Sequence, residues 1–270
     1  MRKMAEGKKE KKKRGLGPVR WLLIVLCAGM AAFSGWKLWG IMKEYREGDQ
    51  TYNNVEEAAF VPAKPKAQGE EDDEDSIIPE IDFASLKGIS KNAVGWLFNP
   101  GTVINYPVAK TTDNSYYIDH MIDGSYNSNG CLFIDYRNKD DLADRNNILY
   151  GHRMKNGKML SSIAQYAKQA YYDAHPVMYY ITEDARYTLE IFSAYTTTAT
   201  SDSYTRRFSD DAEFTAWLKS VTRKSYIKTG VTPTAEDTII TLSTCVRTND
   251  LSRFVVHVRL VKIEEPGSLM

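Results

Sequence analysis

Between residues 81 and 263, hydrophobic and polar positions alternate over short intervals, as they do in proteins built from many strands. Eight apolar runs are rich in Val, Ile, Tyr, Phe and Thr and are separated by turn-forming segments. These runs are VGWLFNPG, TVINYPVAK, GCLFIDY, NNILYGH, VMYYIT, RYTLEIFSAYTTT, DTIITLSTC and RFVVHVRLVKI. Eight short strands are typical of a closed barrel or a sandwich, so the pattern predicts a mainly β fold.

Helical periodicity is confined to a few segments of this region, which predicts peripheral helices. DFASLKGIS is a short helix with Asp82 as its expected N-cap, and KMLSSIAQYAK is a second one. The longest is SDDAEFTAWLKSVTRKSYI, for which Ser209 is the expected N-cap. Its apolar residues recur at i, i+3, i+4 and i+7, and we expect this stripe to dock onto the barrel: Phe214, Trp217, Leu218 and Val221.

The most apolar stretch of the chain lies near its N-terminus, from Trp21 to Met42, and contains a single charge, Lys37. As a helix it would extend about 33 Å, close to the hydrocarbon thickness of a bilayer. We therefore expect a transmembrane anchor over residues 21–42. A cleaved signal peptide is the alternative, because AGMAAFSG offers small residues, but the apolar segment continues after Lys37.

Charge is unevenly distributed around this stretch although the formal net charge of the chain is zero. The first twenty residues carry nine Lys and Arg against two Glu, which predicts a cytoplasmic tail and places residues after the anchor outside the cell. Residues 43–80 contain three prolines and the acidic run Glu70 to Asp75, and are expected to form a disordered stalk. Residues 81–270 then form the folded domain.

Composition narrows the classes of function. A hydrophobic content of 43% is normal for a chain with a packed core. The net positive charge is concentrated in the tail, so we expect no nucleic-acid partner. The three cysteines, Cys27, Cys131 and Cys245, have no short spacing, so we expect neither a disulfide framework nor a metal site, and no cofactor is predicted. Cys131 is expected to fill the core.

Cys245 ends the strand-like run DTIITLSTC and is followed, eight residues later, by Arg253. If the two last strands form a hairpin with a symmetric loop from Val246 to Ser252, Cys245 lies directly opposite Arg253. Alternation then places both side chains on the outer face of the barrel. A neighbouring guanidinium favours the thiolate, which is the nucleophilic form of cysteine.

A catalytic thiol usually needs a proton shuttle, and the chain offers four histidines. His152 is the first candidate because it ends the run NNILYGH and opens a polar stretch, where catalytic groups concentrate. His257 shares a face with Arg253 but lies about 13 Å further along the strand. We expect ordinary structural roles for His257, His120 and His175.

These residues resemble the sortase family. TLSTC followed by the arginine of RFVV resembles the TLxTC and Arg signature of sortases, and NNILYGHRMKNGKM resembles the class B segment around the catalytic histidine. VGWLFNPGTVINYPVAKTTDNSYYI and GCLFIDYRN also resemble class B sortases. The similarity extends over nearly the whole of the expected folded domain.

The resemblance implies an eight-stranded sortase-type β-barrel and a membrane-anchored cysteine transpeptidase. It implies that Cys245 attacks the carbonyl of a Thr in a C-terminal sorting signal, with His152 as acid and base and Arg253 holding the substrate. An oxyanion would be stabilised by Arg253 and a backbone N–H such as that of Val246. Ser243 and Thr244 would shape the pocket. The implied partners are secreted proteins that carry a sorting signal and an amine of a lipid-linked peptidoglycan precursor.

Three alternatives stay open on the sequence alone. A thiol peptidase that only hydrolyses usually carries its cysteine at a helix N-terminus, whereas this cysteine is expected in a strand. A binding module without catalysis would not depend on Cys245. A pilin-polymerising sortase would use a lysine of another protein as its nucleophile.

Overall fold

The computed structural model describes residues 17–62, 77–245 and 251–264, with Cys245 described through its backbone. The chain divides into two compact units, Met1–Arg46 and Glu47–Met270. The first unit contains most of helix α1 (Pro18–Ala59), and its apolar part is exposed. By length and composition, α1 is the one helix among the described residues that could cross a membrane.

The last turns of α1 belong to the second unit, which corrects the expected disordered stalk. Its buried residues, Gly48, Tyr52, Val55 and Ala59, recur at intervals of three and four and so form one helix face. This narrow stripe is surrounded by charged residues, which is why composition alone indicated disorder. The compact unit therefore begins at Glu47 rather than at residue 81, and the acidic run Glu70–Asp75 lies outside the described residues.

The chain after α1 forms a small antiparallel sheet and then a short helix. Strand β1 (Phe60–Val61) pairs with β2 (Glu80–Ile81). Helix α2 (Phe83–Ile89) follows, and the Asp82 carboxylate accepts a hydrogen bond from the Ser85 amide, which confirms the predicted cap.

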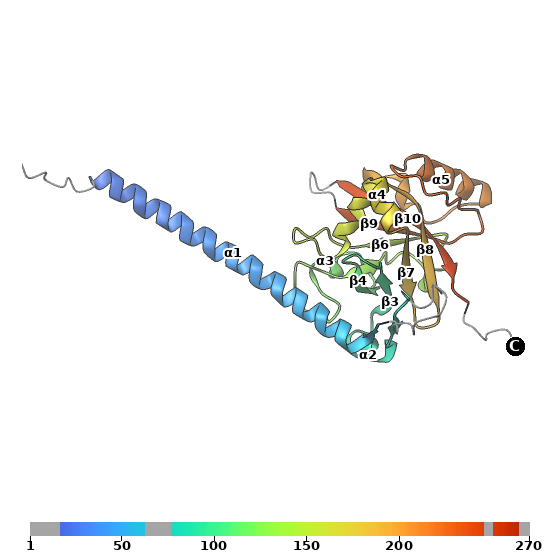
Figure 1. Ribbon diagram of the computed structural model, residues 1–270, viewed down its shortest axis with the longest axis horizontal. Coiled ribbons are helices and arrows are strands. Elements are labelled where there is room, and N and C mark those ends of the chain that lie inside the picture. Colours follow the sequence, from blue (N-terminus) through green and yellow to red (C-terminus); the bar gives the residue numbers. More distant parts are fainter. Residues whose placement is uncertain (1–16, 63–76, 246–250, 265–270) are drawn as a thin grey trace, which may run out of the picture. The chain divides into compact units, whose positions relative to one another are not determined.

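Eight strands form a closed barrel, as predicted (Figure 1). Around the barrel their order is β10-β8-β7-β3-β4-β5-β6-β9. Most neighbours are antiparallel, but β4 pairs with β5 and β6 pairs with β9 in parallel. The strands are β3 (Ala93–Phe98), β4 (Asn105–Ala109), β5 (Leu132–Ile134), β6 (Asn146–Tyr150), β7 (Val177–Ile181), β8 (Arg186–Thr198), β9 (Ile239–Cys245) and β10 (Ser252–Lys262).

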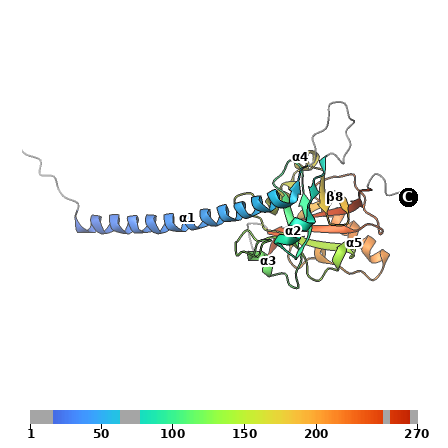
Figure 2. The same ribbon diagram turned by 90° about the horizontal axis from the view of Figure 1, so that it is seen from below.

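Short helices lie around the barrel strands in both views (Figure 1 and Figure 2). The predicted helix at KMLSSIAQYAK is a 3₁₀ helix, η3 (Leu160–Ala167). Only Lys168 separates it from α4 (Gln169–Ala174). The others are α3 (Tyr116–Asp119), η2 (Asp140–Leu142), α4 (Gln169–Ala174), η4 (Asp202–Tyr204) and α5 (Asp211–Arg223).

Helix α5 begins one residue later than expected. Its N-cap is Asp210, whose carboxylate accepts from the Glu213 amide, and not Ser209. Ser209 instead donates its amide and its hydroxyl to the Glu213 carboxylate, at 2.6 and 2.7 Å. Asp210 and Ser209 therefore both contribute to capping α5, whereas the sequence pattern predicted Ser209 alone as the cap.

The predicted apolar stripe of α5 covers the outer face of the barrel next to β8, β9 and β10. All four stripe residues are buried, and they form one cluster with side chains of these three strands. The strand residues of this cluster are Phe192, Tyr195, Ile239 and Val255. One part of the outer face is thus sealed by α5.

Candidate active site

The last two strands hold Cys245 and Arg253 opposite one another. β9 and β10 are antiparallel, and their register pairs Cys245 with Arg253 across the hairpin, which confirms the predicted alignment. Opposed Cα atoms in such a pair are about 4.5–5.5 Å apart. Val246, the expected contributor of a backbone N–H, lies outside the described residues.

The parallel pairing of β6 with β9 brings His152 to the same place. The register pairs Tyr150 with Ser243, and the Gly151 amide donates to the Ser243 carbonyl at 3.2 Å. His152 is two residues beyond Tyr150, and Cys245 is two residues beyond Ser243. Since neighbouring strands lie about 4.8 Å apart, the ends of three adjacent segments, β6, β9 and β10, carry the three predicted catalytic residues.

A cleft of about 350 Å³ opens at this end of the barrel. Four of the six predicted site residues line it: His152, Arg253, Ser243 and Thr244. The other described lining residues are Asn114, Ile118, Phe133, Tyr150, Gly151, Ala199 and Tyr204. The size of the cleft and its mixture of apolar and polar side chains suit a short peptide segment.

His152 is held by a backbone carbonyl. Its Nε2 lies 2.5 Å from the Ile118 oxygen, which can only accept, so the proton of this hydrogen bond belongs to Nε2. The ring is half-buried, and the α-carbon of Gly130 lies against it: a Cβ built at Gly130 would be 3.0 Å from His152 Cδ2. The ring is thus fixed on one side and retains access to the cleft on the other.

The remaining predicted pocket residues differ in their surroundings. The Ser243 hydroxyl and the Tyr204 hydroxyl are 2.8 Å apart and share a hydrogen bond. The buried Thr244 Oγ1 has no hydrogen-bond partner among the described residues. The half-buried Arg253 lines the cleft, and its Nη1 donates to the Ser252 carbonyl at 3.1 Å. Ser243, Thr244 and Arg253 all line the cleft, and their roles in shaping the pocket and holding the substrate stay predictions.

Sequence reasoning missed several residues that line the cleft, above all Tyr150 and Tyr204. Their rings stack with centroids 6.3 Å apart and form a wall of the cleft. Tyr150 directly precedes the Gly-His pair, so its position could have been noted. Tyr204 comes from η4, a segment whose sequence carries no signal for a site.

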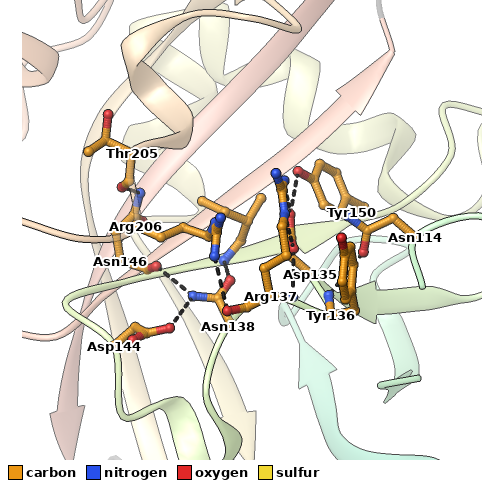
Figure 3. A network of polar contacts seen from close by, with 11 residues as sticks. Asn114, Asp135, Tyr136, Arg137, Asn138, Asp144, Asn146, Tyr150, Thr205 and Arg206 are labelled. Atoms are coloured by element: carbon orange, nitrogen blue, oxygen red, sulfur yellow. Dashed lines mark hydrogen bonds and ion pairs between the residues drawn. The ribbon is translucent and has the colours of Figure 1, made fainter. Parts of the chain in front are cut away.

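A network of polar contacts holds the Tyr150 hydroxyl in place (Figure 3). The Tyr150 hydroxyl donates to the Asp135 carboxylate at 3.1 Å, and Arg137 donates to the same carboxylate through Nε and Nη2. Although burial opposes ionisation, the hydrogen bonds and charge of Arg137 lower the pKa of Asp135 to about 2. Burial and the Asp135 charge raise the pKa of Tyr150, so its hydroxyl remains protonated. Arg206 donates to the Arg137 carbonyl at 3.0 Å and ties the network to the segment after η4.

The other three histidines have structural partners, as expected. His120 stacks on Tyr116, and its Nδ1 lies 2.8 Å from Asp119 Oδ1. His175 Nδ1 lies 3.1 Å from the Pro100 carbonyl. His257 is fully buried, with Nδ1 2.9 Å from Thr241 Oγ1 and Nε2 3.0 Å from the hydroxyl of Tyr195 on β8.

Cys131 is a free, buried cysteine, as expected for a residue of the core. Burial raises the pKa of its thiol to about 12, which makes it a poor nucleophile at neutral pH. Across residues 17–62, 77–245 and 251–264, no three His, Cys, Asp or Glu side chains gather in a way that could hold a metal ion.

Comparison with known proteins agrees with this fold. Residues 100–261 match the model of the Sortase domain family. The chain is 32% identical to sortase B of Listeria monocytogenes over 243 residues, covering 88% of this chain and 95% of that protein. It is 35% identical to sortase B of Staphylococcus aureus over 184 residues, covering 67% and 75%.

Solved structures show the same similarity. The crystal structure of Bacillus anthracis sortase B in complex with AAEK1 superposes with a TM-score of 0.69 at 36% identity, over 83% of this chain and all of that chain. A Staphylococcus aureus sortase B–substrate complex gives a TM-score of 0.65 at 33% identity, over 67% and 85%.

The fold and these relatives indicate a cysteine transpeptidase. The chain belongs to the sortase family, and within it to class B.

Proposed function

We propose that this sortase cleaves a C-terminal sorting signal after a Thr and transfers the new acyl end to an amine of a lipid-linked peptidoglycan precursor. The observation that carries the proposal is the pair of strand registers around β9. Tyr150 pairs with Ser243 on one side and Arg253 pairs with Cys245 on the other. The residues that bear the thiol, the imidazole and the guanidinium thereby belong to adjacent chain segments, and two of them, His152 and Arg253, line one cleft.

In the first half-reaction His152 takes up the Cys245 thiol proton, and the thiolate attacks the Thr carbonyl carbon, so that a C–S bond forms and the carbonyl oxygen becomes an oxyanion. Arg253, which lines the cleft, stabilises this charge, and the Val246 amide is the expected second donor. The intermediate collapses, the amide C–N bond breaks, and His152 gives its proton to the leaving amine. The product of this step is a thioacyl enzyme.

In the second half-reaction the acceptor amine attacks the thioester carbonyl. His152 takes a proton from that amine, a new C–N bond forms, and the C–S bond breaks to return the thiolate. The imidazole thus acts as an acid toward the leaving amine and as a base toward the acceptor amine. A transpeptidase must favour the amine over water, and the apolar walls of the cleft around Ile118, Phe133 and Tyr150 restrict access of water.

The sorting peptide would lie in the cleft, with an NPQTN-like or LPxTG-like pentapeptide as the class of ligand implied by the resemblance. Staphylococcus aureus sortase B has been solved as a substrate complex, and a sortase B has been solved with triglycine. These complexes support a peptide donor and an amine acceptor for this chain as well.

We also propose that α1 anchors the enzyme, with residues 1–20 in the cytoplasm and the catalytic unit outside the cell. The length and the apolar, exposed surface of this helix support a membrane span, and the basic tail favours the cytoplasmic side.

The proposal is tested with the full chain in detergent, a panel of pentapeptide sorting signals and triglycine as the acceptor. Mass spectrometry should detect a thioester on Cys245 and a ligated peptide product. Cys245→Ala should abolish both, whereas Cys27→Ala, which removes the exposed cysteine of α1, should leave both unchanged.

Two outcomes would favour the alternatives. Release of peptide without ligation, unaffected by triglycine, would indicate a thiol peptidase that only hydrolyses. Ligation to a protein lysine but not to triglycine would indicate a pilin-polymerising sortase. Turnover by Cys245→Ala would refute cysteine catalysis altogether.

A further inference from the structure

We propose that Tyr52 of α1 is a positioning residue for His152 and acts through the backbone of residues 117–131. This inference rests on the proposed role of His152 as acid and base. It gives the end of α1, beyond the proposed membrane segment, a part in setting the catalytic geometry.

The first link joins α1 to the loop before β5. The buried Tyr52 hydroxyl donates to the Gly130 carbonyl at 2.5 Å. The Tyr52 ring packs edge-on against Tyr106 of β4, with centroids 5.1 Å apart, so its direction is set by the barrel. Burial raises the pKa of Tyr52 well above its usual value, so the hydroxyl remains a donor.

A glycine on the same face of α1 allows the helix to come this close. Gly48 precedes Tyr52 by four residues and therefore lies one turn before it on the same face. A Cβ at Gly48 would lie 1.9 Å from Asn129 Nδ2, so no larger residue fits unless the Asn129 side chain moves. The helix and the loop are thus in contact at two consecutive turns.

The second link joins this loop to the segment that contains Ile118. The Cys131 amide donates to the Tyr117 carbonyl and the Asn127 amide donates to the Asp119 carbonyl, both at 2.9 Å. These bonds lie on either side of Ile118. The loop therefore orients the Ile118 carbonyl, and the position of the loop in turn depends on the hydrogen bond from Tyr52.

Gly130 lies at the centre of this arrangement. It adopts a left-handed conformation, with φ of +58°. A Cβ there would be 2.5 Å from the Tyr117 oxygen, 2.7 Å from the Ile118 oxygen and 3.0 Å from His152 Cδ2. The residue whose carbonyl Tyr52 holds is therefore in direct contact with the histidine ring and with its acceptor.

The last link is the hydrogen bond from His152 Nε2 to the Ile118 carbonyl. This bond selects the tautomer and orients the ring, as the buried partner of a catalytic histidine does in other enzymes. If the loop moves, the imidazole loses its orientation, while the cleft walls formed by Phe133, Tyr150 and Tyr204 lie outside residues 117–131 and stay in place. Loss of Tyr52 should therefore lower kcat and leave KM unchanged.

The experiment compares Tyr52→Phe with Tyr166→Phe in the full chain in detergent. Tyr166 is the matched control: it is buried, and its hydroxyl also donates to a backbone carbonyl, that of His175, at 2.8 Å. We expect Tyr52→Phe to lower kcat of transpeptidation about tenfold with KM within about twofold of the parent. The control should retain the parent kcat.

A second variant reaches the same backbone without touching α1. Gly130→Ala introduces the Cβ that displaces the Ile118 carbonyl, and we expect the same selective loss of kcat. ¹⁵N NMR of the imidazoles should show that His152 loses its Nε2-protonated signature in both variants and keeps it in Tyr166→Phe. This readout does not depend on turnover.

Equal kcat for Tyr52→Phe and Tyr166→Phe, or an unchanged His152 signature in Tyr52→Phe, would overturn the positioning role. If Tyr52→Phe does not fold, Gly130→Ala provides the same test, and a parent-like kcat there would overturn the role. Failure of the proposed function is seen separately, as retained transpeptidation by His152→Ala, whatever Tyr52 does.

Discussion

Strand β9 has a histidine on each side, and the two have opposite surroundings. His152 follows β6 and lies half-exposed in the cleft, with one nitrogen bound to a backbone carbonyl. His257 lies on β10 opposite Thr241, is fully buried, and has hydrogen-bond partners at both nitrogens. The rings of Phe192, Tyr195 and Trp217 surround it at 5.4 to 5.9 Å between centroids.

The difference arises from what covers the outer face of the barrel. Helix α5 seals the part that contains His257, whereas the end beside Cys245 and Arg253 stays open as the cleft. Burial, with the nearby charge of Lys224, lowers the pKa of His257 to about 3. Such an imidazole does not exchange protons near neutral pH, so it serves the fold, and His152 is the histidine that we propose for proton transfer.

The largest effect expected from this comparison is on catalysis. His152→Gln removes the proton donor and acceptor, and we expect kcat/KM for transpeptidation to fall about 10³-fold with little change in the thermal midpoint. His175→Gln is the control, because that histidine lies outside the cleft and contacts the Pro100 carbonyl. Comparable losses in the two variants would show that His152 has no special role.

At His257, which α5 covers, we expect a loss of stability rather than of activity. His257→Ala removes a fully buried ring and two hydrogen bonds, which we expect to lower the free energy of unfolding by about 3 kcal/mol. Urea unfolding measures the loss. The folded fraction should retain most of its kcat, and His257→Gln, which keeps polar atoms, should cost less. A variant that is stable but inactive would contradict the division of roles.

The pH dependence of stability should also report His257. Its pKa is about 3 in the folded chain and near 6.5 when unfolded, so between these values the unfolded chain binds the proton. The contribution is complete above about pH 6.5 and is lost as the pH falls towards 3, at up to about 1.4 kcal/mol per pH unit. Urea midpoints measured from pH 7 to 4.5 should fall less steeply for His257→Gln than for the parent. The Asp135 carboxylate obscures little of this window, because its folded pKa is about 2 and its contribution to stability is lost only as the pH falls below about 5.

Local pattern was sufficient to predict much of this molecule. The eight strands, the α5 stripe and the pairing of Cys245 with Arg253 follow from alternation, helical period and a symmetric loop. These are interactions between residues close in the chain. The position of His152 at the end of NNILYGH ranked it first among the histidines, and the resemblance to class B sortases pointed to the same residue.

Features that depend on contacts between distant segments were not predictable in the same way. The parallel pairing of β6 with β9 places His152 beside Cys245, but the two strands lie far apart in the sequence and no local signal specifies their pairing. Tyr204 of the 3₁₀ helix η4 lines the cleft, and it was not predicted because no local signal specifies this contact either. The end of α1 falls within the stalk that was expected to be disordered, because its buried stripe is only one residue wide in each turn.

The smallest predicted effect concerns the N-terminus of α5, the helix that covers His257. Asp210 caps α5, and Asp210→Ala removes the acceptor of the Glu213 amide, so we expect the free energy of unfolding to fall by about 1 kcal/mol. Ser209 still bonds the Glu213 carboxylate and should keep the helix in place, so kcat should not change. Ser209→Ala, made alongside, should cost less, because it removes only the hydroxyl bond. A loss of activity in Asp210→Ala would mean that the sealed and open parts of the face are coupled, and that α5 contributes to the cleft as well as to the core.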